Sequence, residues 1–155
     1  MLEKPDSRFF TSYTAIIGYL IIIKIAIHLL LPEYGLHRDE YFYIAIGDQF
    51  SFHNLDMPPL SPLYLRLFTL LFGYSIKVIH FASALCGAVS LLFACLITRE
   101  LSGRKYAVLL TGLFFLFSGF LPFGSIFTYD SLDFLIWVAV IFLLVKILKG
   151  QNPKL

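Results

Sequence analysis

The sequence has few charged residues and few cysteines, and both shortages exclude common classes of protein. Only 14% of its 155 residues are Asp, Glu, Lys or Arg, whereas about a quarter is usual in soluble domains. The net charge of +2 is too small to predict a nucleic-acid partner. The two cysteines, Cys86 and Cys95, lie in one apolar run, too far apart for a disulfide within one helix. Two such cysteines exclude a small secreted module that is held together by several disulfides.

Apolar residues fill most of the chain instead. They make up 59% of the sequence, and the mean hydropathy is +0.82. A membrane-spanning helix needs about 20 consecutive apolar residues, and four stretches meet or approach that length: 11–31, 75–98, 106–123 and 132–148. The sequence therefore predicts an all-α polytopic membrane protein with four transmembrane helices in a single membrane domain over residues 1–155.

The one long connection, 32–74, separates the first two spans and contains four of the seven prolines. Apolar residues between Glu40 and Phe50 recur at helical spacing, which predicts a short helix on the membrane surface with Asp39 as its N-cap. A second amphipathic helix is predicted from Leu60 to Phe72, because Pro58 and Pro59 disfavour a helix before it and favour one after.

The charges are distributed unevenly between the two sides of the predicted spans. A cytoplasmic amino terminus places eight Lys and Arg residues on the inner side and three on the outer side, as the positive-inside rule requires. We therefore expect both termini in the cytoplasm and the loop 32–74 outside. The first span is about 21 residues long and is interpreted as an uncleaved anchor.

Two ionisable residues, Lys24 and His28, share one face of the first span close to the bilayer middle. In one interpretation Lys24 pairs with an acid such as Asp133 or with a bound anion. In the other, which we favour, Lys24 snorkels to the membrane surface while neutral His28 hydrogen-bonds a nearby carbonyl.

Acidic residues occur at three points on the predicted outer side: Asp39 with Glu40, Asp56, and Asp130 with Asp133. Carboxylates at the membrane boundary can deprotonate a hydroxyl group or hold a divalent cation against a phosphate. A helix cap and solvated loop acids explain the same residues without any chemistry.

Three motifs contain these acids: Arg38-Asp39-Glu40-Tyr41-Phe42-Tyr43, Asp56-Met57-Pro58-Pro59-Leu60 and Tyr129-Asp130-Ser131-Leu132-Asp133. In this order, and at these places relative to the spans, they resemble the GT-C class of polyprenyl-phosphate-sugar glycosyltransferases. The similarity is to bacterial relatives of the protein O-mannosyltransferases and of the lipid A aminoarabinose transferase. The aminoarabinose branch has basic residues near the positions of Phe42 and Met57, so no phosphate clamp carries over to either residue.

The resemblance implies an inverting transfer of a sugar from a polyprenyl-phosphate donor to a lipid, glycan or protein acceptor, on the outer face of a bacterial inner membrane. It implies that Asp39, supported by Glu40, is the general base or the carboxylate that orients the acceptor, that Asp133 is a second active-site carboxylate, and that Asp56 binds a divalent metal ion. The predicted substrate-binding residues are Arg38, Tyr43, Arg66, Lys77 and Asp130, of which the three basic ones are chosen by proximity alone.

The family's enzymes have more spans, so this chain is expected to be the amino-terminal part of a larger GT-C module. Donor contacts in the family also come from later spans, which gives a reason for this part alone to be inactive. The alternative is a small four-span structural or transporter-like membrane protein whose acids bind ions or a partner.

Overall fold

The computed structural model describes residues 12–30, 35–49, 58–118 and 125–150, and these residues form six α-helices and no strand. The all-α prediction is confirmed. The helices are α2 (Tyr13–Leu30), α3 (Arg38–Asp48), α4 (Leu60–Phe72), α5 (Ile76–Glu100), α6 (Lys105–Phe117) and α7 (Tyr129–Leu148). Three of them, α2, α5 and α7, are long and apolar enough to cross a membrane, and they correspond to three of the four predicted spans.

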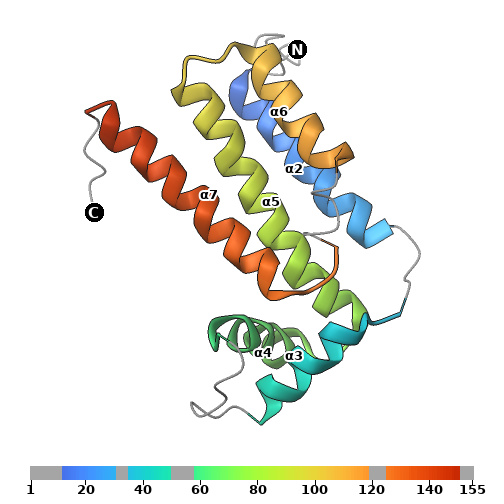
Figure 1. The fold of residues 1–155 in the computed structure, drawn as a ribbon. Coiled ribbons are helices and arrows are strands. Elements are labelled where there is room, and N and C mark those ends of the chain that lie inside the picture. The colour runs from blue at the N-terminus through green and yellow to red at the C-terminus, as the bar shows by residue number, and fades with distance from the viewer. Residues whose placement is uncertain (1–11, 31–34, 50–57, 119–124, 151–155) are drawn as a thin grey trace, which may run out of the picture.

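Helix α5 is the centre of the bundle (Figure 1), because it contacts α2, α6, α7 and α4. Its buried face is rich in small side chains, which allow close helix approach in membranes. An upper core joins α2, α5 and α6, and consists of Ile17, Leu20, Leu91, Cys95, Val108 and Leu116. Both cysteines are buried and free, so they pack as small apolar side chains.

The third predicted span, 106–123, is a shorter helix than expected. Helix α6 ends at Phe117, and Ser118 has an extended backbone, so a continuous helix through the whole stretch is wrong. The cause is local, since Ser118, Gly119 and Pro122 all disfavour helix continuation. At 13 residues, α6 rises about 20 Å, less than the roughly 30 Å of a hydrocarbon core.

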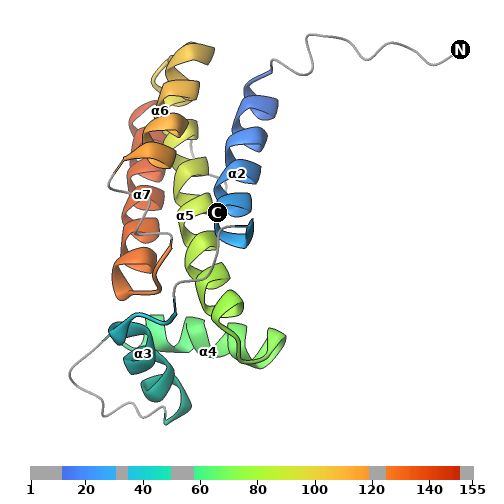
Figure 2. The same cartoon turned by 90° about the vertical axis from the view of Figure 1, so that its right-hand side faces the viewer.

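Helices α3 and α4 lie below the bundle, and Figure 2 shows α4 running across the direction of the long helices. A lower core holds both helices against the start of α5, and consists of Tyr43, Leu65, Phe68, Ile79, Ala82 and Phe127. The helices approach closely at Gly47, where an added Cβ would lie 3.1 Å from the Pro62 carbonyl oxygen. The two helices predicted within the loop 32–74, here called the surface helices, are both present, and α4 has the predicted bounds.

The amino end of α3 differs from the prediction, because the N-cap is His37 and not Asp39. The His37 Nδ1 atom accepts from the Asp39 N–H at 3.4 Å, and the His37 N–H donates to Glu40 Oε2 at 2.7 Å. This is a capping box, in which the cap residue and the residue three positions later satisfy each other's backbone donors. Asp39 lies in the first turn, where negative charge is favoured by the helix dipole.

The charged helix ends gather at the upper end of the bundle in Figure 1. The Arg99 guanidinium at the end of α5 lies 5.6 Å from the Tyr13 ring centroid at the start of α2. The Lys146 Nζ atom at the end of α7 lies 3.8 Å from Glu100 Oε1. The starts of α3 and α7, which carry the acids of the first and third motifs, lie at the opposite end.

The polar pair in α2 agrees only in part with the favoured interpretation. His28 Nδ1 lies 2.8 Å from the Lys24 carbonyl oxygen, so the predicted bond to a nearby carbonyl is confirmed. Lys24 is only 1% exposed, and the expectation that it snorkels to the surface is wrong. The reason is tertiary packing, because α2 turns this face toward the rest of the bundle.

Candidate active site

The third motif forms the amino end of α7, at the boundary between the bundle and the two surface helices. Tyr129 and Asp130 lie in the first turn and Asp133 in the second. A pocket of about 90 Å³ opens here between α7 and the start of α4, and its lining residues are Pro58, Leu60, Ser61, Tyr129, Leu132, Asp133 and Ile136. The structure therefore brings the second and third motifs together.

The first motif meets the same end of α7 through α3. The Tyr129 N–H donates to the Tyr43 hydroxyl at 3.0 Å, and the Phe127 N–H donates to Glu40 Oε1 at 2.8 Å. Burial raises the pKa of Tyr43, and the charges of Asp130 and Asp39 raise this pKa further.

The two acids of the first motif have opposite surroundings. The Asp39 side chain is 41% exposed, and its carboxylate lies 3.4 Å from the Arg38 Nε atom. The Glu40 side chain is completely buried, and its oxygens face the interior of the protein. Asp39 is accessible to a substrate, and Glu40 is not.

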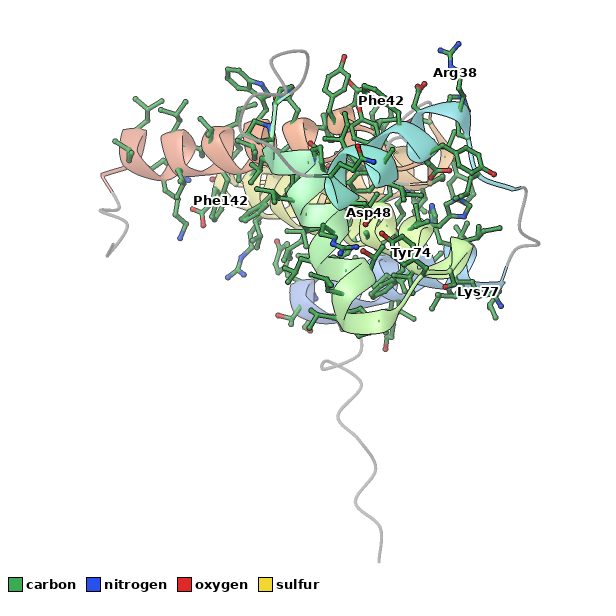
Figure 3. All side chains as sticks on the ribbon, turned by 90° about the horizontal axis from the view of Figure 1, so that it is seen from below. Arg38, Phe42, Asp48, Tyr74, Lys77 and Phe142 are labelled. Atoms are coloured by element: carbon green, nitrogen blue, oxygen red, sulfur yellow. The ribbon has the colours of Figure 1, made fainter. Side chains whose placement is uncertain are left out.

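The three basic residues proposed for the donor phosphate do not gather among the residues that the structure describes. The Arg38 side chain is 92% exposed and points away from the fold in Figure 3, where Lys77 lies at a different edge. Arg66 donates to the Asp48 carboxylate and, at 2.9 Å, to the Tyr74 hydroxyl. The same figure shows Asp48 beside Tyr74, so Arg66 already has an anionic partner.

The predicted metal ligand Asp56 lies outside the described residues. Within the described ranges, no group of three or more His, Cys, Asp or Glu side chains could hold a metal ion. The described carboxylates thus do not form a metal site by themselves.

Sequence reasoning missed the residues that hold the turn before α7, around residues 125–128. His80 Nε2 lies 3.4 Å from Glu40 Oε1. The Ser83 hydroxyl donates to the Ile126 carbonyl at 2.8 Å, and the Phe127 ring is completely buried in the lower core. A histidine inside an apolar run was the available signal for His80, and the spacing of His37 and Glu40 was the signal for the capping box.

The comparisons with known proteins agree with the resemblance over most of the chain. A model of the family described as dolichyl-phosphate-mannose-protein mannosyltransferase matches residues 56–155. The matched range includes the second and third motifs and begins after the first. Searches of curated proteins and of solved structures found no match. Since the family match covers more than half of the sequence, this chain belongs to the dolichyl-phosphate-mannose-protein mannosyltransferase family.

Proposed function

We propose that this integral membrane protein is a glycosyltransferase module that transfers a sugar from a polyprenyl-phosphate donor to an acceptor on the extracytoplasmic face. One observation carries the proposal. Helix α3, which carries the first motif, contacts the amino end of α7, which carries the third motif, through the Tyr43 hydroxyl and the Tyr129 N–H, next to a pocket lined by Asp133 and by Pro58 and Leu60 of the second motif. The family match to residues 56–155 supports the same class of reaction.

In the proposed reaction, an acceptor hydroxyl or amine attacks the anomeric carbon of the donor sugar. A bond from the acceptor oxygen or nitrogen to this carbon forms, the bond from the carbon to the phosphate oxygen breaks, and the configuration inverts. Asp39 is proposed to take the acceptor proton, because its carboxylate is partly exposed. Asp133 is proposed as the second carboxylate, because it lines the pocket. The polyprenyl phosphate leaves with the bonding electrons.

The membrane setting suits such a donor. The pocket wall includes the apolar side chains Leu60, Leu132 and Ile136, and α4 exposes further leucines along its length, such as Leu67 and Leu70. An isoprenoid chain that stays in the bilayer would bring its phosphate to this level. Arg38, which neighbours Asp39 on α3, is proposed to contact the phosphate. Asp130 is proposed to line the substrate side of this end of α7, whereas Tyr43, which is only 2% exposed, contacts the backbone of α7 from inside the protein.

The segregation of charge supports the proposed orientation. The basic helix ends around Arg99 and Lys146 lie opposite the acidic end of the bundle, and the positive-inside rule assigns basic ends to the cytoplasm. We propose a bacterial inner membrane with both termini inside.

The test is sugar transfer from a labelled polyprenyl-phosphate mannose in membranes that contain the full-length protein. Asp39→Asn is expected to lower the rate by about 10²- to 10⁴-fold, the usual contribution of a general base. Glu100→Gln, which neutralises an acid at the opposite end of α5, is the matched control and is expected to retain transfer. Wild-type rates in Asp39→Asn would overturn the role of Asp39.

A second arm of the experiment addresses the metal ion proposed at Asp56. A bound divalent ion would stabilise the charge of the leaving phosphate. Loss of transfer with EDTA, restored by Mg²⁺, would support the ion, and unchanged transfer in EDTA would overturn it.

A further inference from the structure

The amino end of α7 lacks a cap from its own side chains. The N-cap residue is Thr128, and its side chain makes no capping hydrogen bond. The first backbone N–H groups of a helix have no partner within the helix and need an acceptor from elsewhere. Here α3 supplies the acceptor for one of them, since the Tyr43 hydroxyl accepts from the Tyr129 N–H, and Glu40 accepts from the Phe127 N–H in the turn just before the N-cap. The cap of α7 is therefore a tertiary contact with another helix.

Glu40 connects three parts of the fold with one carboxylate. Its Oε2 atom accepts from the His37 N–H at 2.7 Å, and its Oε1 atom accepts from the Phe127 N–H at 2.8 Å. His80 on α5 lies 3.4 Å from the same Oε1 atom. A completely buried carboxylate is stable only with such donors around it. These contacts hold the start of α3, the start of α5 and the turn before α7 at fixed separations.

The other contacts of this turn show that it is a fixed element. His28 Nε2 on α2 lies 2.7 Å from the Ser125 hydroxyl oxygen, and Ser83 on α5 donates to the Ile126 carbonyl. The Phe127 ring stands edge-on to the Tyr43 ring at 5.6 Å between centroids. Contacts from α2, α5 and α3 therefore converge on the turn, and Glu40 supplies it with a charged acceptor.

We infer that Glu40 is a positioning residue that, together with Tyr43, holds the first turns of α7 at a set distance from the first turn of α3. Those turns carry Asp130 and Asp133 on one side and Asp39 on the other. The functional meaning of this distance rests on the proposed function, in which Asp39 and Asp133 act on one substrate. Glu40 acts through the backbone of its neighbours, because its buried carboxylate has no access to a substrate.

The experiment measures the α3–α7 distance directly by pulsed electron resonance between spin labels. The labels replace Tyr41 on α3 and Trp137 on α7, which are both 60% exposed, in a protein with Cys86 and Cys95 changed to Ala. We expect a single narrow distribution for Glu40 and a broadened or shifted one for Glu40→Gln. A glutamine has one oxygen and one NH₂ group, so one of the two backbone N–H groups would face a donor. An unchanged distribution in Glu40→Gln overturns the inference.

Two further variants make this outcome interpretable. Asp39→Asn is the matched control, an acid-to-amide change on the adjacent residue, and is expected to leave the distribution unchanged. If Glu40→Gln does not fold in detergent, Tyr43→Phe removes only the acceptor of the Tyr129 N–H, and broadening in this variant is the expected result. If Tyr43→Phe has a distance distribution as narrow as that of the unmodified protein, the inference is overturned.

Transfer kinetics separate positioning from catalysis. Glu40→Gln is expected to lower kcat by about 10²-fold, since misplacement of a reacting group by about 1 Å has that effect, while KM changes little. Should the unmodified protein transfer no sugar, the proposed function fails, and the distance measurement still decides the role of Glu40. A normal kcat in Glu40→Gln would overturn the positioning role.

Discussion

Removal of the Phe127 ring should release α3 and α4 from the bundle. The ring is completely buried at the centre of the lower core. It lies 5.6 Å from the Tyr43 ring centroid on α3 and 6.1 Å from the Tyr64 ring centroid on α4. Phe→Ala at such a site costs about 3–5 kcal/mol, the sum of lost burial and the cavity left behind. Because the ring contacts aromatic side chains of both α3 and α4, we expect most of this cost to fall on the docking of these two helices.

The measurement is hydrogen exchange of the backbone amides of α3 and α4 in lipid nanodiscs. Every 1.4 kcal/mol corresponds to a factor of ten in an equilibrium constant, so 3–5 kcal/mol predicts exchange about 10²- to 10³-fold faster in Phe127→Ala. Amides in the middle of α5 should change little, because they open only with the whole bundle. Tyr41→Ala, which removes an exposed ring from α3, is the control. Equal exchange in the two variants would refute the conclusion that the lower core holds these helices.

Two further predictions concern the same region. Gly47→Leu should lower the unfolding temperature, because its Cβ would lie 3.1 Å from the Pro62 carbonyl oxygen and overpacking costs about 1–3 kcal/mol. Gly18→Leu, where an added Cβ meets nothing within 4 Å, should not lower it, and equal losses would contradict the close approach at Gly47. Burial raises the pKa of Tyr43 above 10.0, so the unfolded state releases this proton first and stability falls as the pH rises above that value. Thermal unfolding from pH 9 to 11 should therefore show a smaller decline in Tyr43→Phe than in the unmodified protein, and identical slopes would contradict a protonated, buried phenol.

The helices were predictable where the signal was local. The bounds of α4 follow from Pro59 at its start and Gly73 after its end, because each residue acts on the backbone of its immediate neighbours. The helical spacing of the apolar residues in α3 was also recognisable. The N-cap was not, because histidine is an uncommon cap and Asp39 had the stronger propensity. Helix α6 was predicted too long, since hydropathy counts apolar residues and does not register where a Ser-Gly pair ends the helix.

The candidate site was only partly predictable. Asp39, Asp130 and Asp133 stand out as acids in an apolar sequence, and the motifs around them allowed the family to be identified. Nothing local distinguishes the exposed carboxylate of Asp39 from the buried one of Glu40. The difference arises because successive residues of a helix point in directions about 100° apart, and only one of these directions faces α7.

The sequence by itself determined that this chain is a helical membrane protein, which side its charges favour, and which motifs carry its acids, because hydropathy, charge and motif order are properties of neighbouring residues. The tertiary structure alone decided that α3 caps α7, that Glu40 is buried against the Phe127 N–H, and that the pocket joins Pro58 to Asp133. These contacts join residues tens of positions apart, and their geometry depends on how all six described helices pack at once.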